Sequence, residues 1–255
     1  MMSGVPQGAV LVPTLFNIYM AYLPINKNTE GHIYADDVSF TTVGKGPAIQ
    51  AKLQRQLNNV VKWSRDWKME FNPEKTQAII FTRGRKNPPR GLLELAGQRL
   101  PWRSKITYLG LTYDKRLVWH DQMANTIAKA RFLLHACYPL LSCKLCLRTK
   151  ARVYKQMIRP VLTYGSPTWF IPSTSKKQKL AVFQNKILRI VTKAPYFVRN
   201  TTLRRDLDTE DLLDHIRNLT SGFLDRIRQS KNPTVRVSCT KKFNCDRRPL
   251  PADTV

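Results

Sequence analysis

Three features are missing from this 255-residue sequence or scarce in it. No apolar run approaches the ~20 residues that a membrane-spanning helix needs, so we predict a soluble protein with no membrane partner. The first six residues contain neither the basic region nor the apolar segment of a signal peptide, and secretion is therefore not predicted. Acidic residues are few: 17 Asp and Glu stand against 43 Lys and Arg, which gives a formal net charge of +26.

Cysteine is scarce as well, with five residues at irregular spacing. An odd number without a regular framework indicates reduced thiols inside a cell. Cys143 and Cys146 form a CxxC pair that is compatible with zinc, but no second CxxC or CxxH pair follows at the spacing of a zinc finger. We therefore predict ordinary cysteines near helix ends and no zinc site.

The excess of positive charge predicts a polyanionic partner, because it is too large for a neutral surface. The charge is unevenly distributed: residues 1–87 hold eleven basic and six acidic side chains, which leaves 32 against 11 for residues 88–255. We predict that the later part binds the phosphate backbone of nucleic acid. A solubilising basic surface or a membrane-facing patch is the alternative.

Hydrophobic residues make up 42% of the sequence, which is enough for a packed core in a chain of this length. The first part combines strand-like and helix-like patterns, whereas only helical periods follow Trp119, so we predict an α+β fold in which a sheet region precedes a helical bundle. Residues 231–255 are polar and basic, which predicts a flexible tail. The predicted helices span 11–23, 48–67, 121–138, 147–158, 174–193 and 209–230, and the predicted strands lie within 32–40, 76–82 and 92–112.

A glycine-containing loop, Ser3 to Gly8 (SGVPQG), leads directly into the apolar stretch from Leu11 to Leu23. Glycines at the start of a helix let backbone amides approach a phosphate or a base closely. The same pattern is also typical of a plain helix entry without a ligand. The loop alone therefore leaves ligand binding open.

Residues 32–40, HIYADDVSF, place two adjacent aspartates between β-prone residues. Apolar residues alternate before and after the pair, which predicts a β-hairpin with Asp36 and Asp37 at its tip. Carboxylates at such a turn suit Mg²⁺, a hard cation that keeps water and substrate phosphates as its other ligands, and two such ions support phosphoryl transfer. Adjacent aspartates also favour a tight turn without any ligand.

The order of the motifs along the chain resembles that of reverse transcriptases. Pro6-Gln7-Gly8 is followed by an apolar helix, Tyr34-Ala35-Asp36-Asp37, a second helix, Asn72-Pro73-Glu74-Lys75 and Tyr108-Leu109-Gly110. The segments LTYGSPTW (162–169), QNKILRIV (184–191) and APYFVRN (194–200) extend the resemblance over nearly all of residues 3–230. The sequence is similar to the non-LTR (LINE-type) retrotransposon class, in particular to the jockey-like elements of arthropods.

This resemblance implies an RNA-directed DNA polymerase that performs Mg²⁺-dependent nucleotidyl transfer. The implied partners are an RNA template, a DNA primer and deoxynucleoside triphosphates. Residues 1–118 would form part of the polymerase palm, a small antiparallel sheet with helices, and residues 119–230 the helical thumb and the region that follows it. The family also implies a ribonucleoprotein that reaches chromosomal DNA.

The resemblance assigns roles to individual residues of the palm. Asp36 matches the principal metal-binding aspartate, Asp37 its less direct partner, and Tyr34 the residue that flanks the primer end. Lys75 matches the lysine that protonates the departing pyrophosphate or neutralises its charge. The loop that shapes the pocket for template base and incoming nucleotide corresponds to Gly4, Pro6, Gln7 and Gly8, and the primer grip to Leu109 and Gly110.

The helices after residue 121 are predicted to hold the template–primer duplex through basic side chains. The apolar residues between these cations, such as Leu180 and Ile187, are predicted to form core, and so are the five tryptophans. The basic residues predicted to contact the nucleic-acid backbone are Lys176, Lys177, Lys179, Lys186 and Arg189.

One departure from the family pattern concerns the metal site. In the family, a further aspartate on a strand upstream of the glycine loop completes the site, and this sequence begins two residues before that loop. We therefore expect a fragment without the fingers and the first catalytic aspartate, in which the two-metal site is incomplete and which does not polymerise DNA alone. The alternative is a catalytically inactive, basic nucleic-acid-binding remnant.

Overall fold

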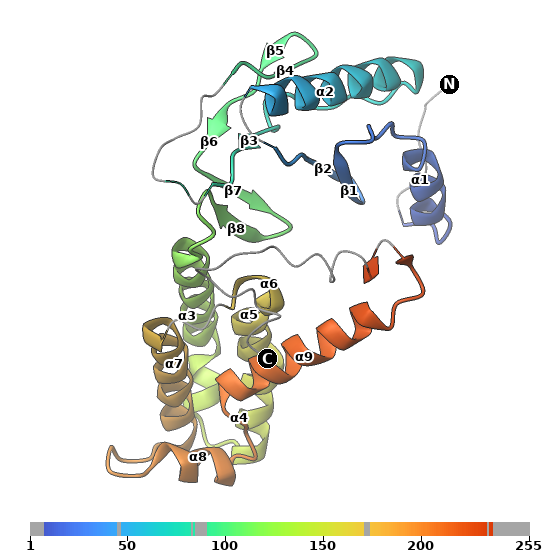
Figure 1. Cartoon of the computed structure of the whole chain (residues 1–255). Helices are drawn as coiled ribbons and strands as arrows, with labels where there is room; N and C mark the ends of the chain where they lie inside the picture. The colour runs from blue at the N-terminus through green and yellow to red at the C-terminus, as the bar shows by residue number, and fades with distance from the viewer. Residues whose placement is uncertain are drawn as a thin grey trace. The chain divides into compact units, whose positions relative to one another are not determined.

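The computed structural model (Figure 1) describes residues 8–44, 47–82, 84, 91–170, 174–233 and 235–236, without the side chains of residues 174–176. The chain divides into two compact units, residues 1–118 and residues 119–255. The first contains helices and short strands, and the described part of the second is helical, so the predicted α+β class is confirmed. None of the helices within the described ranges is long and apolar enough to cross a membrane.

Two helices and a hairpin form the first part of the N-terminal unit. Helix α1 (Val12–Met20) follows the glycine loop, and helix α2 (Ala48–Asp66) follows the hairpin. The hairpin pairs β1 (Glu30–Tyr34) with β2 (Asp37–Thr41) in antiparallel register and leaves a two-residue turn between them. These three elements are the ones that the sequence predicts.

The first hydrophobic core holds the hairpin against both helices. Met20 at the end of α1 is buried together with Val60 and Trp63 of α2, and Val38 and Phe40 of β2 pack against them. Alternate residues of a strand face the same side, so the residues between and before these two face away from the core. The core therefore fixes the side of the sheet on which the aspartate at the start of β2 lies.

Helix α1 also has an apolar face that the described residues do not cover. Leu11, Leu15, Ile18 and Tyr22 recur at helical spacing and are 69%, 50%, 56% and 62% exposed. The opposite side of the same helix contributes Met20 to the core. Helix α1 is therefore apolar on both sides but buried on only one.

The remaining strands form three small pairs instead of one sheet, so that the described residues contain four two-stranded sheets. One of the three pairs is parallel, and the strand predicted over residues 76–82 is only two residues long. The pairs are β3 (Ala78–Ile79) with β6 (Trp102–Arg103), β4 (Glu94–Leu95) with β5 (Gln98–Arg99), and β7 (Lys105–Tyr108) with β8 (Leu111–Asp114).

A second core connects these strands to α2. Leu57 of α2 is buried with Leu93, Leu95 and Leu100, and Phe71 packs against this cluster as well as against the first one. The shared phenylalanine joins the two cores, so both sides of α2 are held in the same unit.

The described part of the C-terminal unit is a bundle of helices. A π-helix lies between two α-helices without a break, so the helical path continues through Pro160, beyond the end of the helix predicted over 147–158. Pro139 likewise lies inside a helix. The helices are α3 (His120–Ser142), α4 (Leu147–Val153), the π-helix η1 (Tyr154–Ile158), α5 (Arg159–Thr163), α6 (Ser166–Trp169), α7 (Thr174–Thr192), α8 (Asn200–Asp206) and α9 (Leu212–Arg228).

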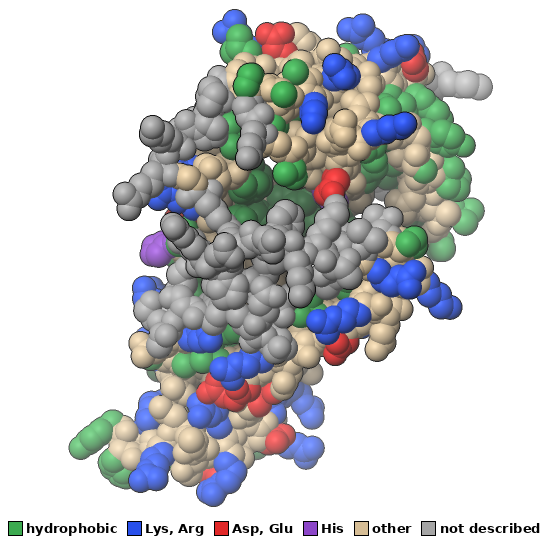
Figure 2. All heavy atoms as spheres, viewed as in Figure 1, with side chains coloured by type: hydrophobic (Ala, Val, Ile, Leu, Met, Phe, Trp, Pro, Cys, Tyr) green, Lys and Arg blue, Asp and Glu red, His purple; other side chains and the backbone are tan. Residues whose placement is uncertain are grey.

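The bundle core contains residues from nearly every helix. Tyr154 and Ile158 of η1 are fully buried, as are Leu180 and Ile187 of α7 and Ile216 of α9. The predictions of core positions on α7 are thus confirmed at those two residues. On the face that Figure 2 shows, basic side chains are more numerous than acidic ones in the described part of both units. Most of the predicted tail, residues 237–255, and the predicted loop at 85–90 lie outside the described residues.

Candidate active site

The tip of the β1–β2 hairpin carries the two aspartates. Ala35 and Asp36 form its two-residue turn, and Ala35 adopts a left-handed φ of +50°. Asp37 is the first residue of β2 and lies opposite Tyr34. Asp37 and the core residue Val38 are neighbours in the strand, so their side chains point to opposite faces.

Both carboxylates and the ring of Tyr34 are open to solvent. Within the described part of the chain, neither Asp36 nor Asp37 takes part in a side-chain hydrogen bond or ion pair. Their oxygens are therefore free to accept a cation. The cavities described below lie in the C-terminal unit and do not include this hairpin.

The donor set at this hairpin fits only part of a magnesium shell. Mg²⁺ is often bound through one or two carboxylates together with water and substrate phosphates. Asp36 and Asp37 could supply these carboxylates. The described residues contain no group of three His, Cys, Asp or Glu side chains that could hold a metal ion. The remaining ligands would have to come from substrate, water or protein groups beyond those residues.

Only one residue of the predicted nucleotide loop, Gly8, falls within the described residues; Gly4, Pro6 and Gln7 lie outside them. Gly8 has a φ of +89°, and a Cβ built there would meet no atom within 4 Å. Because this left-handed conformation strains other residues, glycine is required here for its backbone and not for space.

Lys75 follows a turn that Asn72 stabilises. The side-chain oxygen of Asn72 accepts hydrogen bonds from the backbone N–H groups of Glu74, at 2.9 Å, and Lys75, at 3.2 Å. The backbone oxygen of Asn72 accepts a further bond from the hydroxyl of Thr76, at 2.7 Å. This fixed turn leaves the side chain of Lys75 exposed.

Leu109 and Gly110 form the two-residue turn between β7 and β8. Both have positive φ angles, +47° and +74°, and the flanking residues Tyr108 and Leu111 are paired. Positive φ at both central positions is typical of the type I′ turn, which matches the twist of a hairpin. Glycine accepts this conformation readily, whereas a leucine is strained in it.

The five basic residues predicted to bind nucleic acid all lie on α7, but their surroundings differ. Lys179 and Lys186 are exposed, and the ammonium of Lys177 lies 5.9 Å from the centre of the Phe170 ring. The side chain of Lys176 is outside the described residues. Two of the five, Lys186 and Arg189, line the same cavity.

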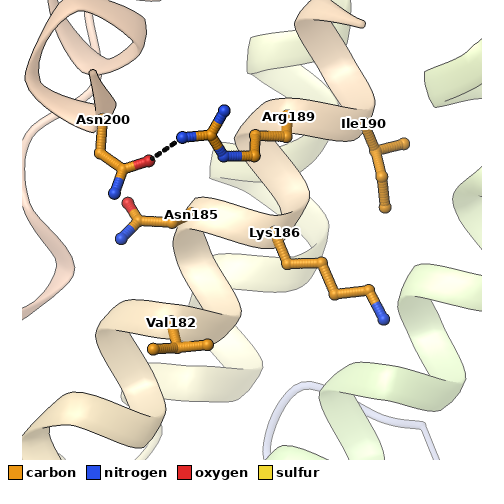
Figure 3. A pocket seen from close by; sticks show the side chains of 6 residues that line it. All are labelled: Val182, Asn185, Lys186, Arg189, Ile190 and Asn200. Atoms are coloured by element: carbon orange, nitrogen blue, oxygen red, sulfur yellow. Dashed lines mark hydrogen bonds between the residues drawn. The ribbon is translucent and has the colours of Figure 1, made fainter. Parts of the chain in front are cut away.

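Arg189 is engaged in the structure of its own unit. Its guanidinium donates hydrogen bonds to the backbone oxygens of Pro195 at 2.8 Å and Val198 at 2.9 Å, and to Oδ1 of Asn200 at 2.9 Å. These bonds connect α7 to the segment before α8 and to Asn200, the first residue of α8, and Figure 3 shows the bond to Asn200. Arg189 thus has a structural role that its charge alone does not reveal.

Two adjoining cavities lie beside this segment, with volumes of about 520 and 620 Å³. Asn185, Arg189 and Asn200 line both, and the side chains of Asn185 and Asn200 lie next to one another (Figure 3). Tyr196 and Phe197 line the larger cavity and are not among the site residues predicted from the sequence. The available signal was two adjacent aromatic residues after a proline, within a stretch that is rich in basic residues.

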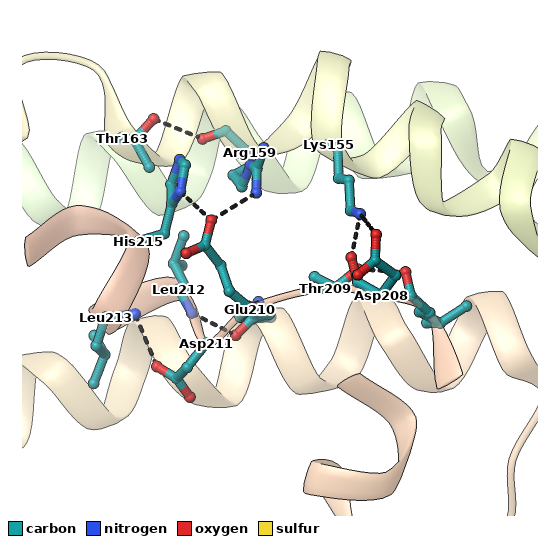
Figure 4. Close-up of polar contacts among 12 residues, drawn as sticks. Lys155, Arg159, Thr163, Asp208, Thr209, Glu210, Asp211, Leu212, Leu213 and His215 are labelled. Atoms are coloured by element: carbon teal, nitrogen blue, oxygen red, sulfur yellow. Dashed lines mark hydrogen bonds and ion pairs between the residues drawn. The ribbon is translucent and has the colours of Figure 1, made fainter. Parts of the chain in front are cut away.

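Several acidic residues of the C-terminal unit lie in the connection between α8 and α9, where basic side chains pair with them (Figure 4). Glu210 pairs with Arg159 at 3.4 Å and with the ring of His215 at 2.5 Å. Asp208 pairs with Lys155 at 3.4 Å. These contacts hold the connection against η1 and α5, whereas Lys179 and Lys186 take part in no ion pair among the described residues.

The two cysteines of the CxxC pair cap helices, as the sequence predicts. Cys143 is the C-cap of α3 and Cys146 the N-cap of α4, and both thiols are free and exposed. Hydrogen bonds from Thr149 lower the pKa of the Cys146 thiol.

Comparison with known proteins agrees with the motif order. Residues 1–113 match the family described as reverse transcriptase (RNA-dependent DNA polymerase). The chain is 33% identical over 240 residues to a probable RNA-directed DNA polymerase from transposon BS of Drosophila melanogaster, and 32% identical over 238 residues to that of transposon X-element of the same species. The predicted resemblance is confirmed.

A third relative of this jockey-like class is the RNA-directed DNA polymerase from mobile element jockey of Drosophila melanogaster, which is 28% identical over 245 residues. The alignments to the BS and jockey polymerases cover 90% and 92% of this chain but 26% of each relative. The chain thus spans about a quarter of the length of the curated relatives that it matches, and its similarity to jockey-like reverse transcriptases continues beyond residue 113 into the helical unit.

Proposed function

We propose that this chain is part of a reverse transcriptase of a non-LTR retrotransposon and contributes to RNA-directed DNA synthesis. The observation that carries the proposal is the hairpin tip, where two unpaired, exposed aspartates lie in a segment that matches the reverse transcriptase family. The proposed partners are an RNA template, a DNA primer and deoxynucleoside triphosphates. In this proposal residues 1–118 act as part of the palm, residues 119–230 as the thumb and its continuation, and residues 231–255 as a basic tail.

Asp36 and Asp37 are proposed to hold Mg²⁺, with Asp36 as the principal ligand. Bound Mg²⁺ would activate the primer hydroxyl and stabilise the leaving oxygen. The chain's own contribution is to keep two carboxylates unpaired at a rigid tip, because Val38 and Phe40 fix the strand behind them. Tyr34 lies opposite Asp37 and is proposed to flank the primer end.

The other turns of the N-terminal unit are proposed to bind the substrates. Lys75, exposed on a fixed turn, would neutralise or protonate the departing pyrophosphate. The Leu109–Gly110 turn would act as primer grip, since a tight hairpin brings backbone close to the primer terminus. The proposed pocket for template base and incoming nucleotide is formed by Gly4, Pro6, Gln7 and Gly8.

Helix α7 is proposed to contact the backbone of the template–primer duplex through its exposed lysines. The exposure of Lys179 and Lys186 supports this role, whereas Arg189 already donates three hydrogen bonds within its own chain. Lys176 and Lys177 complete the proposed set. Each phosphate contact adds to the salt dependence of binding.

The experiment that tests the polymerase proposal replaces the aligned segment of the BS transposon polymerase with residues 8–230 of this chain. Primer extension on an RNA template is expected from the chimera and is expected to be lost on Asp36→Asn. Asp66→Asn, which changes an exposed aspartate at the end of α2, is the matched control and should leave extension intact. Equal extension by the Asp36→Asn chimera would contradict the role of the hairpin tip.

The 255-residue chain alone is proposed not to polymerise DNA, because the described residues supply only two adjacent carboxylates. Extension by the chain alone, lost on Asp36→Asn, would refute this part. Passive binding makes a different prediction: affinity falls by roughly 10³ to 10⁵-fold between 50 and 200 mM salt if 6 to 10 phosphates are engaged, and magnesium is not needed. Magnesium-dependent nucleotide binding that Asp36→Asn abolishes would favour the catalytic role.

A further inference from the structure

The loop between α7 and α8 presents two aromatic rings to solvent. Tyr196 is 90% exposed and Phe197 is 72% exposed, and their ring centres lie 5.8 Å apart with the planes at 79°. Figure 2 shows hydrophobic side chains projecting at the end of this loop, away from the helices. Neither ring contributes to the core, so folding alone does not account for their presence.

The main chain holds these rings in a defined turn. The backbone N–H of Val198 donates to the oxygen of Pro195 at 3.2 Å, which makes Tyr196 and Phe197 the two central residues of the turn. The Arg189 guanidinium binds the oxygens at both ends of this turn, at 2.8 and 2.9 Å. The rings are therefore pre-positioned, which lowers the entropy cost of binding a ligand.

The charged residues that line the cavity beside the rings, Arg189, Arg199 and Arg204, are all basic. Residues 122–205 contain 17 Lys and Arg and no Asp or Glu. Lys186, Lys193 and Arg199 are exposed and have no ion pair or side-chain hydrogen bond within the described residues. The acidic residues that follow this stretch are engaged by other cations, as the pairs Arg204–Asp211 and Arg205–Asp206 illustrate.

The cavities beside the loop add a polar group without a partner. Oδ1 of Asn185 is buried and accepts no hydrogen bond in the structure, although Asn185 lines both cavities. The side-chain amides of Asn185 and Asn200, which line both cavities, can form a hydrogen bond with a polar group of a ligand. A nucleobase offers such a group together with a flat face for an aromatic ring.

We propose that the Tyr196–Phe197 turn is a stacking platform for single-stranded nucleic acid. Exposed aromatic rings flanked by unpaired cations bind single strands, because bases stack on the rings while the cations follow the phosphates. The bases of a duplex are stacked on one another and cannot reach the rings. The inference deepens the proposed function, since it gives the helical unit a single-strand site in addition to the duplex contacts of α7.

The test measures binding of the 255-residue chain to a fluorescent 12-nucleotide oligo(dT) and to a 12-unit abasic strand with the same phosphates. The double substitution Tyr196→Ala, Phe197→Ala is expected to weaken binding of oligo(dT) about fivefold or more and to leave the abasic strand unaffected. Phe132→Ala, which removes a 78% exposed ring from α3, is the matched control and should change neither. Tyr196→Trp keeps a stacking surface and should bind oligo(dT) as tightly as the original chain.

A second pair of variants separates charge from stacking. Lys193→Gln together with Arg199→Gln is expected to weaken both strands equally and to reduce the salt slope by about 1.4, at about 0.7 per phosphate contact. Arg189→Gln should loosen the turn and lower affinity for oligo(dT) more than for the abasic strand, which identifies Arg189 as a positioning residue. An equal loss of affinity for both strands in Arg189→Gln would contradict this positioning role.

Binding of a template–primer duplex, measured in parallel, separates this inference from the proposed function. Unchanged oligo(dT) affinity in the double aromatic variant, with duplex binding retained, overturns the platform and leaves the polymerase proposal standing. Loss of self-association in that variant, seen by sedimentation without loss of oligonucleotide binding, would make the turn a protein interface instead. A chain that binds neither single strand nor duplex at low salt contradicts both proposals.

Discussion

The side-chain amide of Gln184 is hydrogen-bonded to the backbone of Leu212. Oε1 of Gln184 accepts a hydrogen bond from the N–H of Leu212 at 2.9 Å, while Nε2 donates to the oxygen of Glu210 at 2.9 Å. Gln184 is completely buried in the middle of α7, and Leu212 is the first residue of α9. One amide thus serves a buried donor and a partly buried acceptor.

Gln184→Ala is therefore expected to lower the free energy of unfolding by about 1 to 3 kcal/mol, because it leaves the buried N–H of Leu212 without a partner. Urea unfolding measures the change. Gln178→Ala, at an exposed position of the same helix, is the control and should have little effect. Equal stability of the two variants would show that α9 is held by its apolar contacts alone.

Asp211 has two tasks that two substitutions can separate. One carboxylate oxygen accepts from the N–H of Leu213 at 2.8 Å as the N-cap of α9, and the other pairs with Arg204 at 2.8 Å. Asp211→Asn keeps an acceptor for the cap and should cost less than about 1 kcal/mol, with the loss shrinking at high salt. Asp211→Ala removes both and should cost about 1 kcal/mol more. Thermal unfolding of both variants at low and high salt measures the two losses of stability. Identical losses in both variants would show that the N-cap bond and the ion pair are not separate contributions.

The buried phenol of Tyr154 predicts a loss of stability at alkaline pH. Burial raises the pKa of Tyr154 to about 12, which the Gln184 amide opposes only in part. The folded state therefore keeps the phenol proton to a higher pH than the unfolded chain. The contribution of Tyr154 to the free energy of unfolding is complete below about pH 10, and it falls by about 2 to 3 kcal/mol in total as the pH rises toward 12.

Urea midpoints at pH 9 and pH 11.5 test this linkage. Tyr154→Phe cannot ionise, so the variant should lose less stability between the two pH values than the original chain. Tyr164→Phe, at a 57% exposed position, is the control and should follow the original chain. A Tyr154→Phe variant that loses as much stability as the control would argue against the raised pKa.

The turn between β7 and β8 predicts a substitution that stabilises the fold. Leu109 carries a φ of +47°, and Asn-Gly is the dipeptide that this turn type prefers. Leu109→Asn should therefore raise stability by up to about 1 kcal/mol, since asparagine tolerates the left-handed region. If the turn is the primer grip, the same change should weaken primer extension in the chimeric polymerase. A variant with lower stability would mean that the leucine side chain contributes more packing than its backbone costs.

Local patterns in the sequence predicted the elements that short-range forces determine. The alternation around Asp36 and Asp37 predicted the hairpin, because one face of β2 must reach the core. The helical period of residues 48–66 predicted α2 for the same reason. The family motifs supplied the candidate site, which composition and periodicity leave open.

Features that depend on distant contacts could not be predicted in this way. Strand β3 is short and pairs in parallel with β6, a partner that lies more than twenty residues away. Helix α8 has only seven residues, too few for a clear period. Pro160 is the second residue of α5, which follows directly after η1, so the chain passes the residue that lacks an N–H at the point where the wider turn of a π-helix meets α5. The bonds of Arg189 to the loop after α7 likewise require the folded structure.

The exposed apolar face of α1 affects the behaviour of this chain in solution. A contiguous exposed apolar surface promotes association. Aggregation through α1 would therefore limit the concentration at which the protein can be handled. The high net positive charge acts in the opposite direction by mutual repulsion, and salt weakens that repulsion. Buffers of high ionic strength suppress adventitious binding of nucleic acid. Because they also screen the repulsion between chains, they would promote aggregation through α1.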